Sequence, residues 1–463
     1  MLALLLAAAA SCPLRPVDLS IWPGASLNAL HDDCSENLFG LGLPRTRAGQ
    51  LRGVQLALGS AEVDGDAFGL QLAGLASVAG GRAAGAQLSG LANVTGEGFR
   101  GVRLAGLANV AGEDAWTVDV AGLANVAGER SHGLFLAGLA NVAGSGGKGV
   151  HLAGLANVAG DDGAGLYAAG LANVAGADAA GLFLAGFGNV AGGRLRGAQA
   201  AALGNVVGSG GAGLQVAGLG NVSGGVFRGV QLAGIGNVAG ALAGVQLAGI
   251  GNVAAGGEGV QLAGVYNKGI GDLGIVQIAL VNYVDGSTGA QVGLFNVARR
   301  ARLQLGLVNV SESAAVPLGA VSWTRGGERR AELWVSDAVP LQAALRTGNG
   351  RIESLLVAGV RPGTALTAGL GSGVRFPVGG AVSLGADLLA QFVGFTDARG
   401  GKGLLSSLRA RAQWDQAPLA LFAGVSLNGF VSGDRDGREL APGPSLRAGH
   451  LLAWPGLFAG ASL

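Results

Sequence analysis

The sequence has almost no net charge, few histidines and no recognisable catalytic arrangement, and each scarcity excludes a class of function. Thirty basic residues, of which only three are lysine, balance 29 acidic residues for a formal charge of +1, so electrostatics gives no reason to expect nucleic acid as a partner. The four histidines share no motif and no i, i+4 ligand spacing, which argues against a metal site. We therefore predict no catalytic residue, cofactor, metal or small-molecule substrate, and a protein that is not an enzyme.

Long apolar runs are also scarce. The run from Met1 to Ala10 has the length of the apolar region of a signal peptide and is too short to span a bilayer as a helix. No later segment is apolar enough, for long enough, to form a transmembrane helix. We predict that residues 1–11 are an export signal.

Cysteine is rare, with two residues in the chain. Cys12 follows Ala9-Ala10-Ser11 in a loose bacterial lipobox, which lacks the usual Leu three residues before the Cys. Three interpretations stay open: lipidation at Cys12, a Cys12–Cys34 disulfide, or export without either. Each suits an exported protein. Residues 12–48 are predicted to be a non-repetitive leader.

Glycine is abundant instead, with 90 residues, and it belongs to a sequence repeat. An asparagine recurs every 16 residues, a spacing that falls to 15, 14 and finally 13. Around each lies a version of Gly-x-Gln-Leu-Ala-Gly-Leu-Ala-Asn-Val-Ala-Gly. A fixed short period indicates one small unit stacked many times, which we place at residues 49–311. The recurring asparagines are Asn93, Asn109, Asn125, Asn141, Asn157, Asn173, Asn189, Asn205, Asn221, Asn237, Asn252, Asn267, Asn282, Asn296 and Asn309.

The composition of one repeat predicts two short strands rather than a helix. Gly101, Gly106 and Gly112 fall within a single repeat, and each glycine would cost a helix about 1 kcal/mol. The recurring asparagine favours a parallel β-solenoid of about 16 short coils, because stacked asparagines can hydrogen-bond along a ladder of identical neighbours. The fall of the period to 13 favours an antiparallel meander, which we keep as the alternative.

Residues 312–463 have a different pattern, in which side chains alternate between apolar and polar. Leu384, Leu388 and Phe392 fall on one face of a predicted strand, and Asp387 and Gln391 on the other. Strands of about ten residues with this alternation are what a membrane β-barrel requires, although a soluble β-sandwich shows the same pattern. We predict an antiparallel outer-membrane barrel with membrane lipid as its partner, and keep the sandwich as the alternative.

The repeats resemble those of a family of bacterial surface repeat-containing proteins, first described from spirochaetes, whose tandem repeats precede a β-rich C-terminal region. The resemblance rests on Gly229–Asn237, Gly289–Asn296 and Leu303–Asn309, which share the pattern Gly-x-Gln-x-Ala-Gly-Leu-x-Asn in full or in part. It implies exposure at the cell surface and names no reaction or ligand.

Together these patterns predict an exported, non-enzymatic protein of the outer membrane or cell surface. It would present an elongated β scaffold for structural or interaction roles, with an unknown surface or protein as a further partner. The alternative is a periplasmic or lipid-anchored binding module with a C-terminal β-sandwich. The pattern favours neither side of the membrane for the array.

Overall fold

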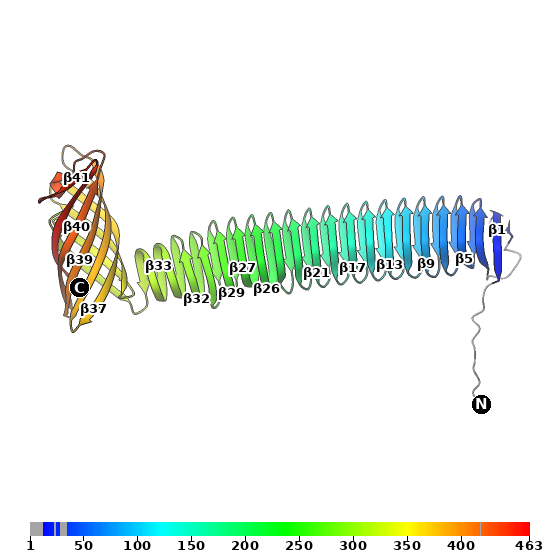
Figure 1. Cartoon of the computed structure of the whole chain (residues 1–463), viewed down its shortest axis with the longest axis horizontal. Coiled ribbons are helices and arrows are strands. Elements are labelled where there is room, and N and C mark those ends of the chain that lie inside the picture. The colour runs from blue at the N-terminus through cyan, green and yellow to red at the C-terminus, as the bar shows by residue number, and fades with distance from the viewer. Residues whose placement is uncertain (1–12, 23–24, 28–34, 417) are drawn as a thin grey trace, which may run out of the picture. The chain divides into compact units, whose positions relative to one another are not determined.

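The computed structural model describes residues 13–22, 25–27, 35–416 and 418–463. This part of the chain forms a parallel β-solenoid of about 17 turns, followed by a closed antiparallel barrel of eight strands (Figure 1). The predicted fold class is confirmed, and the antiparallel meander and the β-sandwich are wrong. The predicted export signal (residues 1–11), Cys12 and Cys34 lie outside the described residues. Within the described ranges, no helix has the length and hydropathy that crossing a membrane requires.

The chain divides into two compact units, Met1–Gly240 and Ala241–Leu463. The first unit consists of coils, and the second begins with coils and ends with the barrel. Each coil has a long strand, a bend, a short strand and, in most coils, a turn. β11 (Phe99–Ala105) and β12 (Ala108–Ala111) form one such coil.

Neighbouring coils pair in parallel, in a register of one repeat. β11 pairs with the long strands before and after it, and β12 with the neighbouring short strands. Thr117 therefore lies beside Gly101, and Asn125 beside Asn109. Identical positions of successive repeats are stacked on one another.

Two glycine positions make this close stacking possible. Gly101 has a φ of 134°, a backbone conformation that L side chains rarely adopt. At the bend, a Cβ on Gly106 would lie 2.0 Å from the carbonyl oxygen of Gly90 in the preceding coil. Most coils therefore carry glycine at both positions, which accounts for much of its abundance, although Thr117 replaces it at the first and Ala202 at the second.

Long and short strands alternate through the first unit. The long strands are β1 (Leu14–Trp22), β3 (Glu36–Gly42), β5 (Gln50–Ala57), β7 (Ala67–Ala73), β9 (Ala83–Ser89), β11, β13 (Ala115–Ala121), β15 (Ser131–Ala137), β17 (Gly147–Ala153), β19 (Gly163–Ala169), β21 (Ala179–Ala185), β23 (Leu195–Ala201) and β25 (Gly211–Ala217). The short strands are β4 (Arg45–Ala48), β6 (Ser60–Val63), β8 (Ala76–Ala79), β10 (Ala92–Thr95), β12, β14 (Ala124–Ala127), β16 (Ala140–Ala143), β18 (Ala156–Ala159), β20 (Ala172–Ala175), β22 (Gly188–Ala191) and β24 (Gly204–Val207). β2 (Ala25–Ser26) differs, because it pairs antiparallel with β1.

Later coils merge a short strand with the long strand that follows it. These strands are β26 (Gly220–Ala233), β27 (Gly236–Ala248), β32 (Val281–Val292) and β33 (Phe295–Thr324), and between them lie β28 (Gly251–Ala254), β29 (Gly257–Ala263), β30 (Tyr266–Gly269) and β31 (Leu273–Ile278). The 14- and 13-residue coils that begin in β32 and β33 have no turn between their strands and still form complete coils. The side chains of Asn296 and Asn309 still meet at 2.9 Å, so 13 residues are enough for one coil.

The coils extend beyond both predicted ends of the array. β1 pairs in parallel with β3, and β3 with β5, so the described part of the predicted leader (12–48) forms coils although it lacks the repeat. At the other end β33 continues past residue 311 to Thr324, and Ser322 accepts the hydrogen bond of Asn309. Parallel pairing uses backbone groups, so a coil can form wherever the inward side chains fit, with or without the repeat.

The barrel consists of eight antiparallel strands, and the pairing of its first and last strands closes it. One further short strand pairs with the last strand, and a 3-10 turn, η1 (Arg438–Leu440), precedes it. The barrel strands are β34 (Glu328–Ser336), β35 (Leu341–Gly348), β36 (Ile352–Arg361), β37 (Ala365–Gly379), β38 (Val382–Phe395), β39 (Lys402–Gln416), β40 (Leu419–Val431) and β42 (Leu451–Ser462), and the further strand is β41 (Leu446–Ala448).

The barrel is apolar outside and polar inside. On β38 the side chain of Leu388 is 60 % exposed, whereas those of Asp387 and Gln391 are 1 % exposed and point into the lumen. β39 and β40 show the same division. The predicted faces of these strands are confirmed.

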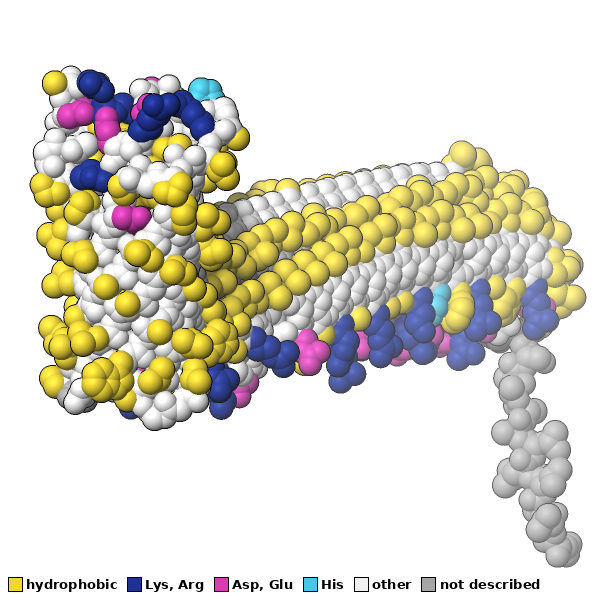
Figure 2. Space-filling model, turned by 60° about the vertical axis from the view of Figure 1, so that its left-hand side comes forward, with side chains coloured by type: hydrophobic (Ala, Val, Ile, Leu, Met, Phe, Trp, Pro, Cys, Tyr) yellow, Lys and Arg dark blue, Asp and Glu magenta, His cyan; other side chains and the backbone are white. Residues whose placement is uncertain are grey.

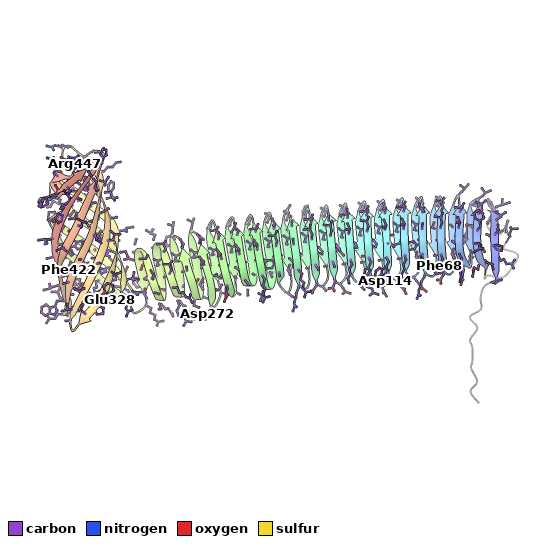
Figure 3. The ribbon with its side chains drawn as sticks, in the orientation of Figure 1. Phe68, Asp114, Asp272, Glu328, Phe422 and Arg447 are labelled. Carbon is purple, nitrogen blue, oxygen red and sulfur yellow. The ribbon has the colours of Figure 1, made fainter. Side chains whose placement is uncertain are left out.

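The two ends of the barrel differ in the length of their connections. Residues 325–327, 349–351 and 380–381 are short turns at one end, whereas residues 396–401 and 432–445 are long loops at the other. The array joins the barrel at the short-turn end, since β33 leads directly into β34. Figure 3 labels Glu328 near this end and Arg447 at the opposite one.

Candidate functional surfaces

The fifteen recurring asparagines are buried inside the coils. The amide of Asn157 shows the contacts that they make. Its Nδ2 donates to Oδ1 of Asn173 at 2.8 Å and to the backbone oxygens of Ala168 and His151 at 2.9 and 3.0 Å. In turn its Oδ1 accepts from Asn141 at 2.8 Å. Because these amides are occupied by their neighbours, they hold coils together and offer nothing to a ligand.

Replacing Asn157 with leucine is expected to lower the free energy of unfolding by about 1–3 kcal/mol, because two buried neighbouring amides each lose a partner. Chemical denaturation followed by circular dichroism measures this change. Val190→Leu, at a position that is 40 % exposed, is the control and should leave the midpoint unchanged. Unchanged midpoints for both Asn157→Leu and Asn173→Leu would contradict a stabilising ladder.

A second interior row occupies the Gln position of the repeat, and its composition varies along the array. Gln55, Gln71 and Gln87 form a hydrogen-bonded ladder. The next two coils carry Arg103 and Asp119, whose side chains are fully buried and meet at 2.5 and 2.9 Å. We did not foresee this ion pair, although the departure from Gln at both positions is visible in the sequence.

An aromatic stack follows the ion pair in the same row. Phe135, His151, Tyr167 and Phe183 lie in successive coils, with ring centroids 4.9, 4.5 and 4.7 Å apart. The His151 Nε2 atom lies 2.8 Å from the Ser131 hydroxyl. Burial lowers the pKa of the His151 imidazole to about 4, and His132 contributes in the same direction. The native stack therefore holds His151 in its neutral form.

The stability of these coils should depend on pH through His151. Its folded pKa of about 4 lies below the ordinary value of 6.5. The stability that the coils have while His151 is neutral is therefore fully present above pH 6.5. It falls by up to about 3 kcal/mol as the pH decreases towards 4. Hydrogen exchange of peptides from residues 147–175, at pH values near 7 and 5, measures the loss. His151→Phe should abolish this dependence and His450→Asn should not; equal acid sensitivity of His151→Phe and the wild type would contradict it.

The outer surface of the coils carries a groove lined only by apolar residues. In the first unit its volume is about 1030 Å³. Leucines and valines near the ends of the long strands form its wall, and the alanines and glycines that follow them form its floor. Figure 2 shows apolar rows running along the coils, with charged side chains gathered along one edge. The lining residues are Val120, Ala121, Leu136, Ala137, Gly138, Leu152, Ala153, Ala168, Ala169, Leu184, Ala185, Ala200, Ala201, Val216, Ala217 and Gly218.

The coils of the second unit carry a groove at the same repeat positions, with a volume of about 750 Å³. Ile278, Leu305 and Leu318 form one wall, and the leucines at the bend form the other. One lining residue belongs to the barrel: Leu370 of β37, whose side chain points outward and is 42 % exposed. We define the apolar groove as these two lined stretches.

The charged edge of the array consists of the turns between coils. Asp114 and Arg130 form an ion pair at 2.9 Å, and Arg130 lowers the pKa of the Asp114 carboxyl. Figure 3 shows Asp114 at this edge. Exposed pairs of this kind contribute little to stability. The charges therefore lie at the turns, and the lined stretches of the apolar groove contain none.

The lumen of the barrel holds a cluster of buried ion pairs. Arg346 contacts Glu332, Glu353 and Asp387 at 2.8–3.0 Å. Arg411 lies on β39, a strand that does not pair with β34, and its guanidinium contacts Glu332 of β34 at 2.7 Å. These contacts join strands across the lumen.

Side chains also pack the lumen around Gln391. Gln391 donates to Gln342 and Thr367 at 3.0 and 3.2 Å. The cavity beside it measures about 10 Å³, which is at the lower limit for one water molecule. The lumen is therefore packed where these residues lie.

No protein-family model matches this chain, and the searches of curated proteins and of solved structures likewise find no match. The resemblance to surface repeat-containing proteins thus rests on the repeats and on the order of coils and barrel. In the described part of the chain, no three or more His, Cys, Asp or Glu side chains gather where they could hold a metal ion. The expectations of no metal, no cofactor and no enzymatic activity stay predictions.

Proposed function

We propose that this protein is an exported, non-enzymatic outer-membrane protein, with a barrel that spans the bilayer and an array that serves as a scaffold. The observation that carries the proposal is that the barrel is apolar on its outer surface and polar in its lumen. Leu333, Val335 and Leu457 point outward and are 57–68 % exposed, while arginines and carboxylates fill the lumen. A water-soluble barrel would have the reverse arrangement.

The outward residues form an apolar belt that hydrocarbon would cover. Burying one leucine or valine side chain stabilises a protein by about 1.5–3 kcal/mol, and large exposed apolar surfaces mark sites of membrane or protein contact. Alternating apolar-out and polar-in strands are typical of outer-membrane barrels. Trp414 and Phe376, near the short-turn end, are 52 % and 61 % exposed, which suits the aromatic girdle at a membrane surface.

The packed lumen supports the role of an anchor rather than that of a pore. Arg346 and Arg411 are paired with carboxylates on other strands, so the charges in the lumen are compensated without solvent. The barrel would therefore hold the array at the membrane. The array offers repeated surfaces for structural or interaction roles.

Cell fractionation tests this proposal. We expect the wild-type protein to stay with outer membranes after washing at high salt and at alkaline pH, because hydrocarbon contact resists both. Release of the wild-type protein into the soluble fraction would contradict the proposal that the barrel lies in a membrane. That result would instead favour a periplasmic or lipid-anchored protein.

A further inference from the structure

The apolar groove presents no group that could recognise a polar ligand. Each residue that lines its stretch in the first unit is Val, Ala, Leu or Gly. The backbone in the adjoining bend is also occupied: Leu139 donates to Leu123, and Leu155 to Leu139, at 2.9 and 2.8 Å. An extended peptide would find no free edge to pair with, and its own polar groups would be left without partners. The occupant must lack hydrogen-bonding groups along its length.

The same repeat positions line the groove in successive coils, although the wall position of the first unit carries Ala168 and Ala200 as well as leucines and valines. Its wall positions carry Leu136, Leu152 and Leu184 in the first unit and Ile278 and Leu305 in the second. A site that repeats along its axis suits a ligand that also repeats, such as a polymethylene chain.

In the second unit the groove reaches the outer wall of the barrel. Leu370, which lines the groove, also belongs to the apolar belt, beside Leu356 and Ala390 on the adjacent strands. The same outward surface of β37 would face hydrocarbon in the proposed membrane barrel. Leu370 would therefore contact both the occupant of the groove and the hydrocarbon of the bilayer.

The contact between the last coil and the barrel is polar. The backbone N–H of Ser322, in the last coil, donates to the Thr347 hydroxyl of the barrel at 3.0 Å. The Ser322 hydroxyl meets the Ser354 hydroxyl at 2.8 Å. Nearby, the guanidinium of Arg329 lies 3.5 Å from the ring of Trp323. Polar contacts and a tryptophan–arginine pair are typical of the interface between membrane and water. The groove meets the belt beside this interface.

We propose that the apolar groove binds the acyl chains of phospholipids and opens onto the bilayer at Leu370. The proposal rests on the proposed membrane barrel. In outer-membrane barrels the short turns face the periplasm and the long loops face outside. Because β33 joins the barrel at its short-turn end, the stretch of the groove in the second unit would lie in the periplasm and meet the inner leaflet of the outer membrane. This differs from the cell-surface exposure that the resemblance implies.

Site-specific photo-crosslinking of the full-length protein tests the groove. A photoreactive amino acid replaces Leu152 or Leu305 in the groove, or Val190 on the short strand β22, whose exposure lies between those of the two leucines. We expect phospholipid adducts at Leu152 and Leu305, at least ten-fold above those at Val190. Adducts joining two protein chains would show that a second copy covers the groove. That outcome, equal labelling at Val190, or no lipid adduct would each overturn the proposal.

Paired substitutions give a second measurement. Leu152→Asp with Leu184→Asp places charges in the groove, whereas Val190→Asp with Val206→Asp places them at comparably exposed positions outside it. We expect phosphatidylethanolamine with a radiolabelled acyl chain, added to detergent-purified protein, to bind at least ten-fold less to the first variant and normally to the second. Equal binding to both variants would overturn the proposal, provided that circular dichroism shows both to be folded.

These experiments distinguish a failure of the proposed lipid site from a failure of the proposed membrane barrel. Binding of labelled lipid to purified protein does not require the barrel to lie in a membrane, and fractionation does not require the groove. If the wild type fractionates as soluble but still binds acyl chains at Leu152, the membrane barrel fails and the lipid site survives. If it fractionates with membranes but gives no adduct, only the lipid site fails.

Discussion

Replacing Leu388 with arginine should prevent the barrel from assembling in the outer membrane. Leu388 lies in the middle of β38, between Ser372 and Leu408 of the adjacent strands, and its outward side chain is 60 % exposed. An arginine near the bilayer midplane costs about 2–4 kcal/mol. Fractionation should find the variant degraded or absent from outer membranes, and folded barrel should fall to a small fraction of the wild-type amount.

The matched control is Leu446→Arg, which introduces the same charge on β41, outside the eight barrel strands, at a side chain that is 81 % exposed. It should assemble normally. In a soluble barrel Leu388→Arg would also be harmless, because an exposed leucine gains nothing from water. Normal assembly of both variants would therefore argue against hydrocarbon contact at β38.

Removing one complete coil, residues 149–164, should leave a folded and exported protein. The deletion brings Tyr167 against Phe135 and Asn173 against Asn141, so each interior row continues without a break. Coils of a solenoid contact only their neighbours, and stability is close to a sum over them. Resistance to proteolysis and the far-ultraviolet circular dichroism spectrum should remain close to those of the wild type.

Removing half a coil, residues 149–156, should have the opposite effect. The inward side chains of the following strands would meet outward positions of the preceding coil, and the required glycines would fall out of line. We expect loss of the folded, exported protein. Equal behaviour of the two deletions would show that the repeat is not the structural unit.

The array could be predicted from the sequence because each coil repeats the same residues at the same places. The spacing of Asn93, Asn109 and their successors favours parallel stacking, and Gly106 and Gly112 locate the bends. The coils before residue 49 could not be predicted in this way. Their strands pair through the backbone, and their inward residues, such as Asp18 and Asn37, follow no repeat.

The barrel was predictable in its faces but not in its closure. Alternation in β38 separates Leu388 from Asp387, yet the same pattern fits a sandwich, and only the pairing of β34 with β42 closes the sheet. The packing of the lumen could not be predicted from the sequence either. The sequence places Gln391 on the polar face of its strand, but does not show that it is hydrogen-bonded to Gln342 and Thr367 inside the barrel. The apolar groove depends on how the strand ends and bends stack, which no single repeat reveals.

The asparagine ladder has a direction. From Asn93 to Asn237, and again from Asn252 to Asn309, each Nδ2 for which the contact is described donates towards the C-terminal neighbour. The last amide donates to Ser322, and among the described atoms Oδ1 of Asn93, at the first amide, has no hydrogen-bond partner. One amide turned the other way would set two oxygens face to face on one side and two NH₂ groups on the other. Each coil thus inherits its amide orientation from its neighbour, and a row of separate side chains behaves as a single polarised chain that can reverse only as a whole.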